Sequence, residues 1–227
     1  KILWTGIYQM ASGIQPVAFL TDFDDTAAVQ NVAEMLLEKF GESSWKDVRL
    51  RFRQGQMTLK TYQELVFAEI KTAAEVMGEY ASEETTLRPG FGEVYQYCSD
   101  KNIPVAVVSL GLDLYIKPVL KNNGFDNIPV YCVETFYDNG KLAYTYKNMR
   151  EGREDEGNSK GLVVHSFKNR GYKVVYAGDG RSDFEAAREA DVIIARSILI
   201  DECEAHNINY STFEDFYDIL NILKTLS

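Results

Sequence analysis

Short, mainly apolar runs alternate with amphipathic stretches over the second half of the chain. Apolar runs of this length predict strands covered on both faces, and apolar residues at helical spacing predict helices. The predicted strands are residues 17–21, 104–109, 130–134, 173–177 and 192–195. The predicted helices are residues 91–101, 112–122, 159–169, 182–190 and 212–226. This alternation is typical of an α/β fold with a doubly wound, Rossmann-like parallel sheet.

Two stretches depart from this pattern. Residues 28–88 carry apolar positions at helical spacing and no clear strand, and Thr58 is placed to cap a helix. The dipeptide Asn139-Gly140 lies between two short apolar runs and predicts a hairpin turn. We therefore expect a core domain formed by residues 17–27 and 89–227, an inserted all-helical cap domain over residues 28–88, and an N-terminal extension over residues 1–16.

The first predicted strand ends in three acidic residues, Asp22, Asp24 and Asp25. Side chains alternate along a strand, so we expect Asp22 and Asp24 to project to one side and Phe23 to the other. Two adjacent carboxylates repel each other and stay ionised together only beside a cation, and oxygen ligands suit Mg²⁺. An Asp after an apolar run is also common as a plain turn residue, so this feature alone does not define a site.

Three further polar features follow strands or begin helices later in the chain. They are Ser109-Leu110-Gly111, Lys160 and the turn Gly178-Asp179-Gly180, which is followed by Asp183. A serine hydroxyl, a glycine backbone and a lysine are suited to a phosphate group, and Asp179 can share a cation with Asp22. Each feature alone is ordinary, but ligands of parallel sheets bind at the carboxyl ends of the strands, where all of these features fall.

Composition narrows the class of protein. The net charge of −10 argues against a nucleic-acid partner, which needs a basic surface. No apolar run approaches the about 20 residues that span a bilayer, so we expect no membrane partner. The three cysteines have no disulfide or metal-binding spacing, and the opening residues lack the long apolar region of a signal peptide. These observations favour a cytoplasmic location with buried, reduced thiols.

The acidic, serine, lysine and Gly-Asp-Gly features occur in the order found in the haloacid dehalogenase superfamily, which this chain resembles from residue 17 to about residue 200. Asp22-x-Asp24-x-Thr26 is similar to the first family motif, Ser109 to the second, Lys160 to the third, and Gly178-Asp179-Gly180-x-Ser182-Asp183 to the fourth. The helical insertion after the first motif resembles the phosphoserine-phosphatase-like branch. Residues 198–216 are also similar to a methionine-salvage phosphatase that acts on a methylthiopentenyl phosphate.

The resemblance implies a Mg²⁺-dependent phosphatase of a small phosphorylated metabolite. It implies that Asp22 is the nucleophile that forms an aspartyl-phosphate and that Asp24 is the general acid and base. Mg²⁺ would be held by Asp22, the Asp24 backbone carbonyl and Asp179. The phosphate would be bound by Ser109, Leu110, Gly111 and Lys160. Thr26 and Asp183 would orient the metal-binding and phosphate-binding residues without contacting the substrate.

Departures from the family pattern concern the substrate. Phosphoserine phosphatases bind the amino acid part of the substrate with a Glu after the first motif and an Arg in the insertion. An alignment without gaps places Asn31 and Glu64 at these two positions here. Phosphoserine is therefore disfavoured, and Asn31, Arg51 and Arg53 become candidates for substrate contact. The alternatives from other classes are a phospho-accepting signalling domain and a non-catalytic binding relative. A nucleotide-dependent kinase is disfavoured because the chain has no Gly-x-x-x-x-Gly-Lys-[Ser/Thr] motif.

Overall fold

The computed structural model describes residues 15–226, and within them seven strands form one sheet in the order β4-β3-β2-β1-β5-β6-β7. Neighbouring strands run parallel except β3 and β4, which form an antiparallel hairpin at one edge. The strands are β1 (Val17–Thr21), β2 (Val105–Leu112), β3 (Val130–Asp138), β4 (Lys141–Thr145), β5 (Lys173–Gly178), β6 (Val192–Ala195) and β7 (Ser211–Thr212). The predicted α/β sheet is confirmed, as is the hairpin turn at Asn139-Gly140, where both residues have positive φ.

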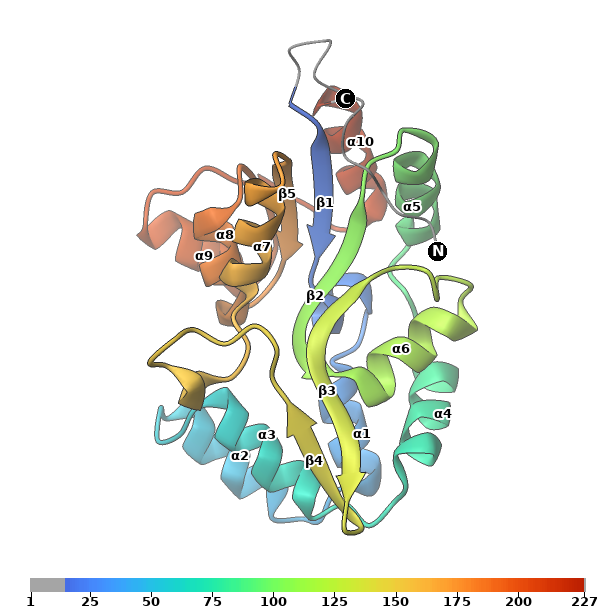
Figure 1. Cartoon of the computed structure of the whole chain (residues 1–227), viewed down its shortest axis with the longest axis vertical. Helices are drawn as coiled ribbons and strands as arrows, with labels where there is room; N and C mark the ends of the chain where they lie inside the picture. The colour runs from blue at the N-terminus through green and yellow to red at the C-terminus, as the bar shows by residue number, and fades with distance from the viewer. Residues whose placement is uncertain (1–14, 227) are drawn as a thin grey trace.

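Five α-helices lie between β1 and β2, and from β2 onward helices alternate with strands except in the β3–β4 hairpin (Figure 1). The α-helices are α1 (Val32–Phe40), α2 (Trp45–Arg53), α3 (Leu59–Ala68), α4 (Ala74–Glu84), α5 (Phe91–Asp100), α6 (Asp113–Asn122), α7 (Lys160–Asn169), α8 (Phe184–Glu189), α9 (Ile198–Ala205) and α10 (Phe216–Leu226). The Thr58 side chain accepts a hydrogen bond from the Thr61 backbone N–H and caps α3, as predicted. Helix α9 was not predicted, because its short apolar pattern is not distinct from that of a strand.

The central strand β1 explains why the sheet has a separate core on each face. Its side chains alternate, so Val17 and Phe19 enter one apolar cluster while Ala18 and Leu20 enter another. On the first face Phe19 packs edge-on against Phe216 of α10, with the ring centroids 6.3 Å apart. The second face is covered by α7. This double burial fixes the position of β1, and therefore of the residues that directly follow it.

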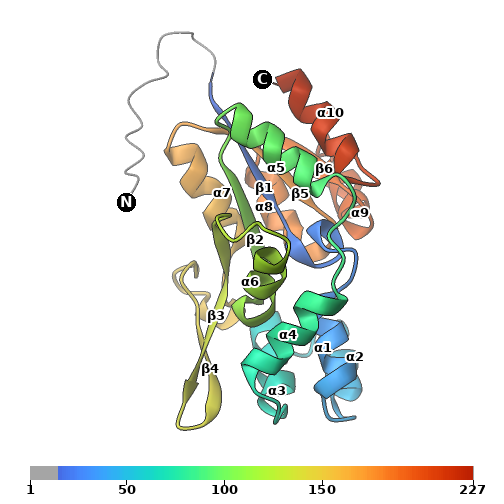
Figure 2. The same cartoon turned by 90° about the vertical axis from the view of Figure 1, so that its right-hand side faces the viewer.

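Helices α1–α4 gather beyond the carboxyl ends of β1 and β2, beside the β3–β4 hairpin (Figures 1 and 2). The chain leaves and re-enters the sheet region through two adjacent segments that are joined by backbone hydrogen bonds. Val29 N–H donates to the Thr86 carbonyl at 2.9 Å, and Arg88 N–H donates to the Ala27 carbonyl at 2.8 Å. The helical character predicted for residues 28–88 is thus confirmed, and these helices lie over the edge of the sheet where the site was expected.

Two local predictions were wrong. Strand β1 ends at Thr21, so strand alternation does not place Asp22 and Asp24; Asp24 and Asp25 instead lie in an irregular turn, in which Asp25 has φ +57°. Strand β2 does not end at Ser109 but continues to Leu112. Its register against β3 shifts between Val108 and Leu112, because the strand is irregular where Ser109-Leu110-Gly111 passes.

Other sequence predictions concern the thiols, the membrane and the N-terminal residues. All three cysteines are buried and free. Among the described residues, no helix has the length and apolar character required to cross a bilayer. Most of the predicted N-terminal extension, residues 1–14, lies outside the described residues, as do the opening residues that were compared with a signal peptide.

Candidate active site

A cavity of about 870 Å³ lies between the carboxyl ends of β1, β2 and β5 and the helices α1–α3. Its floor includes every acidic or cationic side chain that the sequence placed in the core motifs except Asp183. The lining residues from this set are Asp22, Asp24, Asp25, Lys160 and Asp179. Segments that lie far apart in the sequence are therefore brought to one place, as the strand-end argument predicted.

Lys160 forms the charged centre of this floor. It is the first residue of α7, whose N-terminus is capped by the Ser159 side chain, and it is only 2% exposed. Its Nζ lies 2.8 Å from Asp22 Oδ1 and 2.6 Å from Asp183 Oδ1. Burial alone would lower the pKa of Lys160, but the two carboxylates outweigh burial and raise the pKa above its ordinary value. The ammonium group is therefore charged and faces Asp22.

Asp183 holds the turn that carries Asp179. Its Oδ1 accepts from Lys160 Nζ and, at 2.5 Å, from the Tyr176 hydroxyl. Its Oδ2 accepts from the backbone N–H groups of Asp179 and Gly180 at 3.0 and 2.9 Å. Since both oxygens already accept two hydrogen bonds, Asp183 acts as a support and has no lone pair left for a metal ion.

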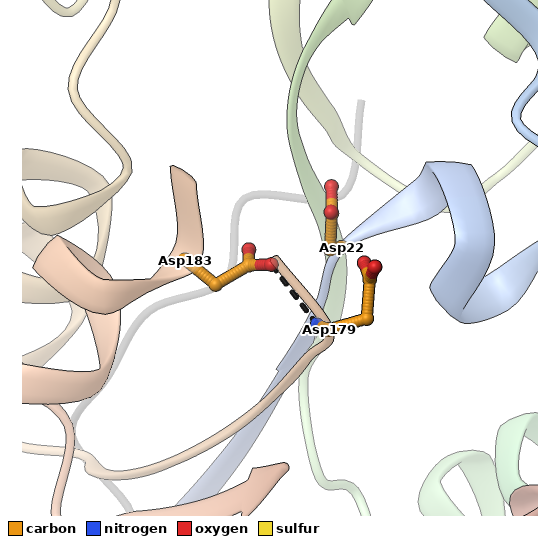
Figure 3. Close-up of side chains that lie close together, drawn as sticks. All are labelled: Asp22, Asp179 and Asp183. Carbon is orange, nitrogen blue, oxygen red and sulfur yellow. Dashed lines mark hydrogen bonds between the residues drawn. The ribbon is translucent and has the colours of Figure 1, made fainter. Parts of the chain in front are cut away.

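Asp22 and Asp179 are the carboxylates of this floor that are suited to a cation. One oxygen of each lies within 4.8 Å of the other and of an Asp183 oxygen (Figure 3). Burial, and then the nearby Asp183, raise the pKa of Asp22 and bring that of Asp179 to about 7. Thr26 Oγ1 donates to Asp179 Oδ1 at 3.0 Å and fixes its side chain. This crowded, all-oxygen donor set fits a small divalent cation, which would relieve the repulsion.

Asp24 is held by two donors on the other side of the cavity floor. Its Oδ1 accepts from the Val32 N–H, at the start of α1, at 2.7 Å, and its Oδ2 accepts from the Tyr115 hydroxyl at 2.8 Å. Burial raises the pKa of Asp24 to about 6, although both hydrogen bonds oppose this shift. The Tyr115 hydroxyl fits there because residue 111 is glycine: a Cβ at Gly111 would lie 2.0 Å from it.

The Ser109-Leu110-Gly111 segment faces the floor from β2. Ser109 is buried, and its Oγ accepts from the Gly111 N–H at 3.0 Å. Gln63, a buried residue of α3, donates from Nε2 to the Leu110 carbonyl at 2.9 Å. This bond joins the helical roof of the cavity to the segment that was predicted to bind phosphate.

The roof of the cavity differs in character from its floor. Most of the roof residues are apolar or aromatic: Ala33, Leu37, Phe52, Met57, Leu59, Tyr62 and Phe67. One ion pair, Glu34 with Arg49, also lines it. Of the three candidates for substrate contact, Asn31 and Arg53 line the cavity, whereas Arg51 is exposed on α2 and is not part of its lining.

Several residues at this site were missed by the sequence analysis. Tyr115, Tyr176 and Gln63 belong to ordinary apolar or amphipathic patterns, and no local signal separates them from core residues. Glu34 and Arg49 were missed because residue counting took no account of the path of α1 and α2. Asn31 was considered for substrate contact, but its side chain also caps α1 and donates to Asp25 Oδ2 at 2.9 Å.

The structure thus brings a buried lysine and several carboxylates together at the carboxyl ends of parallel strands in an α/β sheet. The sequence profile of the haloacid dehalogenase-like hydrolases matches residues 19–188, so the chain belongs to this family. The predicted family and fold class are therefore confirmed.

Individual relatives agree with this assignment. A protein of Brevibacillus brevis named 2-hydroxy-3-keto-5-methylthiopentenyl-1-phosphate phosphatase is 24% identical over 206 residues, covering 89% of this chain and 93% of its own. A Bacillus cereus protein of the same name is 28% identical over 208 residues, covering 90% of this chain and 94% of its own.

Solved structures show the same fold. A phosphoserine phosphatase with a phospho-aspartyl intermediate analogue has a TM-score of 0.69 at 20% identity, with coverage of 94% of this chain and 100% of that one. A substrate-bound phosphoserine phosphatase complex has a TM-score of 0.68 at 20% identity, with coverage of 92% and 98%.

Proposed function

We propose that this protein is a Mg²⁺-dependent phosphatase that hydrolyses the phosphomonoester of a small metabolite through an aspartyl-phosphate intermediate. The observation that carries the proposal is the convergence of Asp22, Asp179 and Lys160 at one edge of the sheet, under a cavity of about 870 Å³. The phosphatase names of the relatives support the same reaction class.

In this mechanism the Asp22 carboxylate attacks phosphorus, and the bond from phosphorus to the leaving oxygen breaks. Asp24 gives its proton to that oxygen, so the product leaves as a neutral alcohol. Asp24, now ionised, then takes a proton from the water that attacks the aspartyl-phosphate, which releases inorganic phosphate and restores both carboxyl groups. The pKa of about 6 for Asp24 suits a group that must both donate and accept a proton near neutral pH.

The remaining floor residues neutralise and position the phosphoryl group. Lys160 supplies a fixed positive charge, and Ser109 with the backbone of Leu110 and Gly111 supplies donors. Mg²⁺ would be held by Asp22, Asp179 and the Asp24 backbone carbonyl, and when bound it supplies positive charge that offsets the negative charge of the phosphoryl oxygens. Asp183 and Thr26 keep Lys160 and Asp179 in place.

We also propose that α1–α4 act as a cap domain over residues 28–88, with the core domain formed by residues 17–27 and 89–227. The paired entry and exit segments and the Gln63 bond to Leu110 support this division. Closing the cap would exclude water from the cavity floor while the ester bond is attacked.

The roof of the cavity supports a methylthiopentenyl phosphate as the first candidate substrate. Its apolar and aromatic residues suit an uncharged, partly apolar leaving group such as a thioether chain, and the relatives at 24–28% identity carry that substrate in their names. Phosphoserine is the second candidate. The Glu34–Arg49 pair in the roof favours it, since a carboxylate and a guanidinium together can bind an amino acid zwitterion.

The proposal is tested by phosphate release from a panel of phosphorylated metabolites that includes both candidates, with para-nitrophenyl phosphate as a general substrate. We expect turnover with Mg²⁺, loss of turnover after EDTA treatment, and recovery when Mg²⁺ is restored. The highest kcat/KM is expected for an uncharged, partly apolar leaving group. Full activity in EDTA would contradict the proposed metal, and no turnover of any phosphomonoester would contradict the reaction.

The Tyr115→Phe variant is expected to move the pH profile of kcat/KM. The Tyr115 hydroxyl stabilises the ionised form of Asp24, so its loss raises the pKa of Asp24 further. Because Asp24 must be protonated to release an alcohol, the alkaline limb of the profile should shift to higher pH. The measurement uses an alkyl phosphomonoester, and Tyr131→Phe, on the opposite face of the sheet, is the control. An unchanged alkaline limb would argue against Asp24 as the acid.

A further inference from the structure

Arg88 lies where the chain returns from α4 to the sheet, and its side chain points back at the turn that follows β1. Its Nε donates to the Thr26 carbonyl and its Nη2 donates to the Asp25 carbonyl, each at 2.8 Å. Its backbone N–H donates to the Ala27 carbonyl. Three consecutive carbonyl groups of one turn are thus bound by a single residue more than 60 positions further along the chain.

The two carbonyls that the guanidinium binds belong to a turn whose backbone conformation is unfavourable. Asp25 has φ +57°, a left-handed conformation that is unfavourable for a residue with a side chain and persists only where the surroundings enforce it. A planar guanidinium can donate to both carbonyls at once, which a lysine ammonium or a neutral amide does not reproduce. The turn therefore depends on Arg88 for its shape as well as for its hydrogen bonds.

The same turn positions two groups of the cavity floor. Asp24 directly precedes Asp25, so the backbone angles at Asp25 are coupled to the direction of the Asp24 carboxyl group. Thr26 donates its hydroxyl proton to Asp179 Oδ1 at 3.0 Å. A displacement of the Asp25 and Thr26 carbonyls would consequently move the side chain of Asp24 on one side and that of Asp179 on the other.

We propose that Arg88 is a positioning residue for the reaction: its guanidinium holds the Asp25–Thr26 turn in the shape that aims Asp24 and Asp179 into the cavity. Since Arg88 also lies in the segment through which the chain leaves α1–α4, it links the helical roof of the cavity to this turn. This inference rests on the phosphatase activity proposed above, but it assigns a role to a side chain that does not line the cavity.

The test is the Arg88→Ala variant, assayed with para-nitrophenyl phosphate and Mg²⁺. We expect kcat to fall about 10²-fold, a loss that misplacement of a catalytic group by about 1 Å produces, while KM changes little. Guanidinium ion added at a concentration far below a denaturing one should restore part of the lost kcat. The control is Arg170→Ala: Arg170 lies over the Phe167 ring, with its guanidinium carbon 4.6 Å from the centroid, and should show neither the loss nor the rescue.

Several outcomes would overturn the inference. A folded Arg88→Ala protein with wild-type kcat, or one whose lost kcat does not respond to guanidinium ion, would show that Arg88 does not position the turn. If Arg88→Ala fails to fold, Arg88→Lys keeps the charge without the planar fork and should still lose kcat; wild-type kcat there would show that charge alone suffices. Wild-type turnover in the same assay separates these results from failure of the phosphatase proposal itself.

Discussion

The Asp22→Asn variant is expected to lose about 10⁴- to 10⁶-fold in kcat for every phosphomonoester that the wild-type protein hydrolyses. The amide cannot form the aspartyl-phosphate, and it removes one of the two carboxylates that would hold Mg²⁺. The variant should nevertheless fold. Burial and the neighbouring Asp183 raise the pKa of Asp22, which means that its charged form is disfavoured in the metal-free fold. A neutral side chain relieves that cost.

Two measurements separate loss of chemistry from loss of structure. The melting temperature of metal-free Asp22→Asn should equal or exceed that of the wild-type protein at pH 7. Asp126→Asn, an exposed site remote from the cavity, should retain wild-type turnover. Substantial turnover by a folded Asp22→Asn protein would refute the nucleophile assignment.

The Lys160→Met variant is expected to lose both stability and activity. Lys160 is 2% exposed, and it is the cation within 2.8 Å of two carboxylates, those of Asp22 and Asp183. Removing one member of a buried ion pair typically lowers the free energy of unfolding by about 3–5 kcal/mol, because the charges left behind are uncompensated. Chemical denaturation at pH 7 measures this loss, and steady-state assays measure the accompanying fall in kcat.

A second lysine provides a matched comparison for this prediction. Lys168, on the same helix, pairs with Asp191 at 3.0 Å, but its side chain is 37% exposed. Because solvent screens this pair, Lys168→Met should cost no more than about 1 kcal/mol and should leave turnover unchanged. Equal losses for the two variants would mean that Lys160 is an ordinary ion-pairing residue.

The core of the fold and the floor of the site were predictable from the sequence because both depend on local patterns. The apolar runs around Phe19, Val107 and Val175 define strands regardless of what surrounds them, and the polar residues that follow them must meet at one edge of a parallel sheet. Lys160 was recognisable as the first residue of a helix, although its near-complete burial was not.

The parts of the site that could not be predicted depend on contacts between distant segments, and no local sequence pattern indicates these contacts. Tyr115 and Gln63 have the same pattern as core positions, and only packing brings their polar groups to Asp24 and Leu110. The end of β2 was misplaced because a register shift against β3 is a property of the strand pair and cannot be predicted from one strand alone. The cavity roof was predicted least well, since α1 and α2 bring Glu34 and Arg49 together from different helices.

The fit between Gly111 and Tyr115 limits how this enzyme could be altered by mutation. A methyl group at residue 111 would lie 2.0 Å from the tyrosine hydroxyl and 3.0 Å from an Asp24 oxygen, so residue 111 cannot gain volume while Tyr115 keeps its place. Any route to a larger side chain at 111 must first pass through a smaller residue at 115. Libraries that randomise codon 111 while codon 115 still encodes tyrosine would therefore contain mostly sequences with this steric clash, whereas libraries that vary both codons together can avoid it.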